Sequence, residues 1–157
     1  MSAPTIIEAA VNGATTPDRN PNVPRTPEEI AADGLRCVEA GAAIVHNHNA
    51  DMAVEPARAA ELYLEAWRPI LRVRPDVLLY PTVGFGGSIE ERYAHVALLA
   101  EAGVLRVGLV DPGSVNLGDF VYVNATSDIA HEVGLCAQHR LGPSVSIFEP
   151  GFLRAAL

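Results

Sequence analysis

His46 and His48 flank a single residue at the end of an apolar run, in the stretch AGAAIVHNHNAD. Side chains alternate along a β-strand, so residues two apart point to the same face. We therefore expect His46 and His48 to share a face with Ile44, while Val45 and Asn47 face the other way. Two imidazoles on one strand face can share a zinc ion, although a catalytic site needs a third protein ligand. The alternative is a polar strand end whose histidines form ordinary hydrogen bonds.

Carboxylates and an amide stand in or after two other apolar runs. Glu8 lies inside the first run, TIIEAAVN, and Asn12 ends it. A carboxylate in an apolar strand is costly unless it is paired, so Glu8 either faces solvent or lines an inner face, where it can act on a metal or as a base. Glu149 follows the last run, SVSIF, and we expect it at the level of His48.

Glycines cluster after the third apolar run, in YPTVGFGGS. Thr82 ends the run, and Gly84, Gly86 and Gly87 follow it. Such glycines let the backbone approach a ligand closely, and their N–H groups can hold an anion before a helix. A tight turn also needs glycine, so the pattern alone leaves both interpretations open.

The fourth run is followed by DPGSVNLGD, which is longer than a minimal connection between a strand and a helix. Ser114 and Asn116 in this stretch are candidates to contact a substrate. A structured loop with Pro-Gly and Asx turns is the alternative.

Strands and helices of regular spacing must position these residues. Apolar runs predict strands, and the amphipathic segments between them predict helices. Two capping boxes, Thr26 with Glu29 and Ser88 with Glu91, mark helix starts. The expected strands are Thr5–Asn12, Ala42–His48, Val77–Val83, Leu105–Val110 and Ser144–Phe148; the expected helices cover 27–40, 56–73, 89–102 and 128–141; Gly41, Gly103 and Gly142 are the expected left-handed helix ends.

Alternating strands and helices predict an α/β fold with a parallel sheet. A doubly wound sheet lacks support, because no Gly-x-Gly-x-x-Gly turn follows the first strand. Polar residues after successive strands instead favour a (β/α)8 TIM barrel, whose chemistry gathers at the carboxyl ends of its strands. Eight units need about 250 residues. We therefore expect residues 1–157 to form a single α/β domain, an incomplete barrel of four to five units that ends at the start of a fifth helix.

The charge of the chain limits the classes of partner that we expect. The formal net charge is −8, and the 11 basic residues form no cluster. Nucleic acid and anionic membranes both favour a basic surface, so neither is expected. The amino terminus lacks the features of a signal peptide. Cys37 and Cys136 are isolated, which is typical of buried thiols in a reducing cytoplasm.

Several stretches together resemble one family, the β-keto acid cleavage enzymes, whose founding activity is 3-keto-5-aminohexanoate cleavage in lysine fermentation. The resemblance covers essentially the whole chain, and it departs from the family pattern at Thr15, where one family member has glutamate, and at Asn47, where leucine is usual. The stretches that carry it are NG after the first run, NPNVPRTPEEIA, EAGA, the histidine pair, YPTVGFGG and GSVNLGD.

The resemblance implies a zinc-dependent barrel that condenses a β-keto acid with acetyl-CoA to give acetoacetate and a new acyl-CoA. His46 and His48 match the first two metal ligands of the family. Its third ligand, a glutamate from a late strand, would fall beyond Leu157. Thr82 and Ser114 match positions with hydroxyl groups near the substrate.

Two other functions stay open. Histidine pairs of this spacing occur in other metal-dependent barrels, so a hydrolase or an aldolase without CoA is one alternative. The other is a catalytically inactive half-barrel. Its exposed strand edges would favour pairing with a second chain, and we therefore expect a homo-oligomer.

Overall fold

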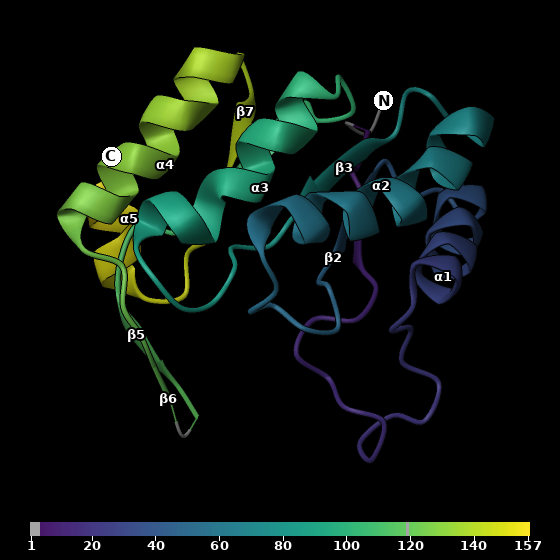
Figure 1. Ribbon diagram of the computed structural model, residues 1–157, viewed down its shortest axis with the longest axis horizontal. Coiled ribbons are helices and arrows are strands. Elements are labelled where there is room, and N and C mark those ends of the chain that lie inside the picture. Colours follow the sequence, from purple (N-terminus) through teal and green to yellow (C-terminus); the bar gives the residue numbers. More distant parts are fainter. Residues whose placement is uncertain (1–3, 119) are drawn as a thin grey trace.

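The computed structural model describes residues 4–118 and 120–157. Strands and helices alternate along the chain, with an extra pair of short strands before α4 and a short helix at the end (Figure 1). The elements are β1 (Glu8–Ala10), α1 (Pro27–Glu39), β2 (Ile44–Asn47), α2 (Pro56–Val73), β3 (Leu78–Pro81), α3 (Ile89–Glu101), β4 (Val107–Val110), β5 (Val115–Leu117), β6 (Phe120–Tyr122), α4 (Thr126–His139), β7 (Gly142–Val145) and α5 (Pro150–Ala156).

The longer elements form two layers. Strands β1, β2 and β3 pair in parallel in that order, β4 pairs in parallel with β7, and β3 contacts β4. Helices α1 to α4 follow one another along one side of these strands, each in contact with the next (Figure 1). The predicted α/β fold with parallel strands is therefore confirmed.

The core lies between the helices and the strands. Val45 and Leu79 point from β2 and β3 toward the helices, where they meet Trp67 and Ile70 of α2 and Leu99 of α3; all are buried. The apolar stripe of each helix supplies this layer, as helical spacing predicts. Because apolar burial is the main driving force of folding, this layer fixes which strand face remains for polar side chains.

Local signals set the helix ends. Both predicted capping boxes are present, at Thr26 and at Ser88. Gly41 and Gly103 have positive φ angles of 108° and 73°, as predicted for left-handed helix ends. The prediction for Gly142 is wrong. Arg140 adopts the left-handed conformation instead, with φ 56°, while Gly142 already pairs with β4.

The strands are shorter than predicted, because ladder pairing ends them. The β2–β3 ladder ends at the pair Asn47 and Pro81, and Pro81 has no N–H with which to continue it. The last strand is β7 rather than Ser144–Phe148, since β4 pairs from Gly142 onward. Glu149 therefore lies beyond the strand, at the N-cap of α5.

The stretch predicted as a loop after β4 contains an antiparallel hairpin, β5–β6. It extends away from the two layers (Figure 1). Asn116 thus lies in a strand, paired with Val121. Among the helices that the structure describes, none has the length and hydropathy needed to cross a membrane.

Candidate functional site

The imidazoles of His46 and His48 face each other. Their Nε2 atoms are 3.1 Å apart, and the ring centroids are separated by 5.0 Å. The Nδ1 atom of His46 lies 3.1 Å from the carbonyl oxygen of Tyr80. A carbonyl only accepts, so Nδ1 carries the proton and Nε2 keeps its lone pair. The pair is therefore oriented with two nitrogens converging on one point.

Burial keeps both histidines neutral. It lowers the pKa of His46, and it lowers the pKa of His48 to about 4, with a further contribution from the charge of His46. Within the described residues, the buried Nδ1 atom of His48 has no hydrogen-bond partner. Neutral imidazole is the form that binds metals.

The donor set fits two of the ligands of a zinc ion. Two nitrogens that share a tetrahedral zinc are about 3.3 Å apart, close to the 3.1 Å seen between the Nε2 atoms. The structure brings no group of three or more His, Cys, Asp or Glu side chains into metal-binding range over residues 4–118 and 120–157. A catalytic zinc site has three protein ligands, of which the histidine pair would supply two.

Asn47 anchors the other face of the same strand. Its Oδ1 atom accepts a hydrogen bond from Trp67 Nε1 at 2.7 Å, and its backbone carbonyl accepts one from Tyr63 at 3.4 Å. Asn47 is fully buried, whereas His46 and His48 are half-buried. The predicted alternation of the strand is therefore confirmed, and the polar middle residue of the motif has a structural partner in α2.

Asn12 holds the backbone of His48. Its side chain donates to the carbonyl of His48 at 2.9 Å and accepts from the N–H of His48 at 2.8 Å. It also donates to the carbonyl of Pro24 and accepts from the N–H of Gly13. The structure thus places Asn12, predicted to bind substrate, directly beside the histidine pair, where it positions His48.

Glu8 lies on the histidine face of the sheet. Ala10, His46 and Tyr80 occupy one row across β1, β2 and β3, and the Tyr80 hydroxyl donates to Glu8. The Tyr80 ring stacks on His46 at a centroid distance of 4.4 Å. Burial, followed by the bond to Glu8, raises the pKa of Tyr80 to about 12. Glu8 is thus connected to the histidine pair through a tyrosine that the sequence motifs did not single out.

The glycine-rich loop borders a different space. Thr82, Gly84, Gly86 and Gly87 line a pocket of about 370 Å³, whose described lining includes Tyr63 but neither histidine of the pair. The carbonyl of Thr82 accepts from Nε2 of His95, at 2.9 Å, and the N–H of Gly84 donates to a carbonyl of α3.

Gly86 and Gly87 have positive φ angles of 79° and 72°. They turn the chain into the capping box of α3, in which Glu91 accepts from the N–H of Ser88 at 2.8 Å. A carboxylate therefore stands directly beside the loop predicted to hold an anion.

The remaining predicted residues lie farther along the chain. The hydroxyl of Ser114 accepts from the N–H of Asn124 at 2.9 Å and donates to its carbonyl, closing the base of the hairpin. Asn116 and Glu149 are exposed. No contact of Ser114, Asn116 or Glu149 with the histidine pair is seen in the described part of the chain.

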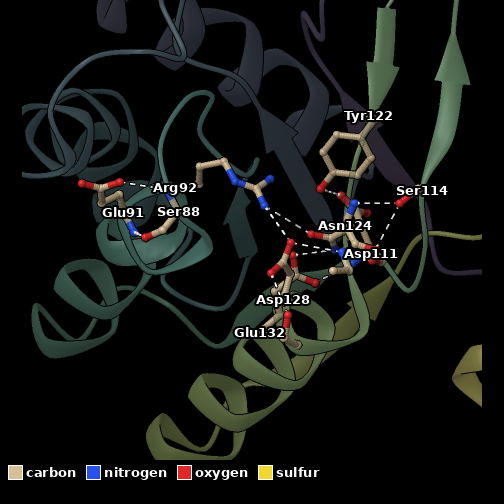
Figure 2. Close-up of polar contacts among 11 residues, drawn as sticks. Ser88, Glu91, Arg92, Asp111, Ser114, Tyr122, Asn124, Asp128 and Glu132 are labelled. Atoms are coloured by element: carbon tan, nitrogen blue, oxygen red, sulfur yellow. Dashed lines mark hydrogen bonds and ion pairs between the residues drawn. The ribbon is translucent and has the colours of Figure 1, made fainter.

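A buried polar network at the end of β4 has no signature in the sequence. Asn124 donates to Glu132 at 3.0 Å and to the carbonyl of Asp111, and Glu132 also accepts from the N–H of Asp111 at 3.0 Å (Figure 2). Tyr122 donates to the Asp111 carboxylate at 2.9 Å. Arg92 reaches Asn124 from α3 at 3.5 Å. The only sequence signal is a glutamate at a buried position of a helix.

Comparison with known proteins extends over the whole described region. Residues 4–157 match the family model described as BKACE, beta-keto acid cleavage enzyme. A 3-keto-5-aminohexanoate cleavage enzyme of Fusobacterium nucleatum is 30% identical over 100% of this chain and 57% of its own length. The enzyme of the same name from Acetoanaerobium sticklandii is 30% identical, over 97% of this chain and 55% of its own length.

A third relative is the 3-dehydrocarnitine:acetyl-CoA trimethylamine transferase of Rhizobium meliloti, 31% identical over 98% of this chain and 58% of that protein. The chain thus spans a little over half the length of the curated relatives it matches. Because the family model matches residues 4–157, this chain belongs to the β-keto acid cleavage enzyme family.

Proposed function

We propose that this chain supplies the zinc-binding part of an enzyme that condenses a β-keto acid with acetyl-CoA to give acetoacetate and a new acyl-CoA. The convergence of the two Nε2 atoms, 3.1 Å apart, carries this proposal. Family membership supports the reaction class, and the name of the Rhizobium meliloti relative contains acetyl-CoA as a substrate.

A zinc ion held by His46 and His48 would polarise the keto oxygen of the substrate. The Tyr80 carbonyl orients the imidazole of His46, and Asn12 holds the backbone of His48. Glu8, beside Tyr80, is the carboxylate of the described chain best placed to move a proton on this face. Thr82, Ser114 and Glu149 remain proposed catalytic residues, Asn116 a proposed substrate contact, and Gly84, Gly86 and Gly87 proposed cofactor-binding residues.

The complete enzyme is proposed to be a (β/α)8 barrel. The contacts of β1, β2, β3, β4 and β7 follow chain order, as strand contacts do in such a barrel. The β1 edge and the segment after β7 both expose apolar side chains, among them Ile6 and Phe148. In a closed barrel these edges would pair with its remaining strands, whereas in a half-barrel they would favour a homo-oligomer. Both cysteines are free thiols, as in proteins of the reducing cytoplasm.

Metal analysis of the purified chain tests the proposal. We expect about one zinc per chain, and its loss in both His46→Ala and His48→Ala. His139→Ala is the matched control, because His139 lies at the end of α4 and the variant should keep its zinc. A second assay measures acetoacetate formed from β-keto acids with and without acetyl-CoA. A folded chain that binds no zinc would overturn the proposal.

A further inference from the structure

The β4–α4 connection, residues 111–125, carries two proposed site residues, Ser114 and Asn116, on a hairpin outside the core. The hairpin extends from the body of the molecule (Figure 1). Val121 is 63% exposed and Phe120 is 46% exposed. A two-stranded hairpin is only marginally stable by itself in water. The direction in which this hairpin points therefore depends on the contacts at its base.

Asn124 makes several of the polar contacts there, beside the bond of Tyr122 to Asp111 and the buried cluster of Val115, Tyr122 and Phe152. Its backbone closes the hairpin against Ser114, and its side-chain amide donates to the carbonyl of Asp111 and to Glu132. Its side-chain oxygen faces Arg92 of α3 (Figure 2). The base of the hairpin is thereby tied to the end of β4 and to two helices at once.

Glu132 is the part of this network that packing does not explain. It is 0% exposed, and burying a carboxylate is expensive unless hydrogen bonds compensate for the lost water. Each of its two oxygens accepts one N–H, from the backbone of Asp111 and from the side chain of Asn124. An apolar residue would fill the same volume without that cost, but it would leave both donors without an acceptor. What the carboxylate provides is a fixed link between these two residues.

We infer that Glu132 is a positioning residue for the active site: by linking the Asp111 backbone to Asn124, it fixes the hairpin that carries Ser114 and Asn116 relative to the strand ends. The catalytic part of this inference rests on the proposed function. The structural part, that Glu132 orders the hairpin, stands without it.

Exchanging the hydrogen-bond donor and acceptor between Asn124 and Glu132 tests whether Glu132 orders the hairpin. Glu132→Gln keeps one acceptor but turns an N–H toward the amide of Asn124. Asn124→Asp in the same chain supplies the missing acceptor and places a carboxylate beside Arg92, at the cost of one donor to the Asp111 carbonyl. Hydrogen exchange of amides 115–117 and 120–122 should accelerate about tenfold in Glu132→Gln, the loss expected for one buried hydrogen bond. The double variant should restore most of the protection.

Equal exchange rates in the wild type and in Glu132→Gln would overturn the inference. So would a double variant that exchanges faster than either single variant, because the two changes would then act independently. Neither result depends on whether the chain cleaves β-keto acids.

Steady-state kinetics test the catalytic part. In Glu132→Gln we expect kcat/KM for the β-keto acid to fall about tenfold at unchanged zinc content, and the double variant to recover most of it. Val96→Ala is the control for lost stability, since Val96 is a buried core residue outside the network, and its kcat/KM should match the wild type. An equal fall in Val96→Ala and Glu132→Gln would overturn the positioning role. Absence of cleavage activity in the complete wild-type enzyme would instead refute the proposed function, while the exchange data would still decide the structural role.

Discussion

The histidine pair and the Glu132 network are both polar groups withdrawn from water at the ends of strands, yet their hydrogen bonding differs. Both oxygens of Glu132 accept an N–H. By contrast, the Nε2 atoms of His46 and His48 have only each other, and Nδ1 of His48 has no partner among the described residues. The Glu132 carboxylate is therefore satisfied within the fold, although Oδ1 of the neighbouring Asp111 has no partner among the described residues. We expect changes at Glu132 to act mainly on stability, and changes at the histidine pair, the proposed zinc site, to act mainly on ligand binding.

Breaking the Glu132 network should have the largest effect on stability. Glu132→Leu leaves the buried N–H groups of Asp111 and Asn124 without an acceptor, and each such loss costs about 1–3 kcal/mol. We expect the free energy of unfolding, measured by urea denaturation, to fall by about 3 kcal/mol. Glu101→Leu, at the exposed end of α3, should change it by less than about 0.5 kcal/mol. Equal midpoints for Glu132→Leu and the wild type would contradict this.

The hydrogen bond between Trp67 and Asn47, on the helix side of β2, should have the next largest effect on stability. Trp67→Phe leaves the buried Oδ1 of Asn47 without a donor, which should lower the free energy of unfolding by about 2 kcal/mol in urea denaturation. Adding Asn47→Leu replaces both polar partners by apolar groups, and the double variant should recover part of that loss. If the double variant were less stable than Trp67→Phe, the bond would not be what ties β2 to α2.

The pH dependence of the free energy of unfolding should report on Glu132. Burial raises the pKa of Glu132 from 4.5 to about 7, so between these values the folded chain binds more protons than the unfolded chain. Its contribution to the free energy of unfolding therefore decreases as pH rises from 4.5 to 7. In Glu132→Gln this decrease should be absent, a difference of about 1 kcal/mol or more between the two curves.

The contribution of His95 to the free energy of unfolding increases as pH rises, opposite to that of Glu132, because burial lowers the pKa of His95 to about 4. Its contribution is present above pH 6.5 and is lost as pH falls toward 4. It is common to both proteins, so it cancels when their curves are subtracted. Parallel curves for the wild type and Glu132→Gln would contradict the assignment to Glu132.

Removing a histidine of the pair should have the smallest effect on the metal-free fold. His48→Ala deletes a ring whose Nδ1 atom is already without a partner, so the free energy of unfolding should change by less than about 1 kcal/mol. Zinc should raise the melting temperature of the wild type and leave that of His48→Ala unchanged, because only a ligand bound to the folded state stabilises it. A metal-free loss as large as that of Glu132→Leu would make the pair structural.

Features coded by neighbouring residues were predictable. The capping boxes at Thr26 and Ser88 need only residues three apart, and the alternation of His46, Asn47 and His48 follows from strand geometry. Each depends on backbone conformation within one or two turns, so no distant contact is needed to specify it.

Features that depend on distant pairing were missed. The end of β2 is set by Pro81, the limits of β7 by its register with β4, and the position of Glu149 by that same register. The pattern of the hairpin predicts only a loop, because its strands are three residues long and alternate only weakly.

The sequence by itself determined the α/β class, the helices and the two histidines on one strand face, because these follow from the periodicity of nearby side chains. Only the tertiary structure decided that Asn12 holds His48, that Tyr80 joins Glu8 to His46, and that Glu132 meets Asp111 and Asn124. These contacts join residues 8 to 72 positions apart. Their geometry is set by the packing of whole helices against strands, which no local pattern specifies.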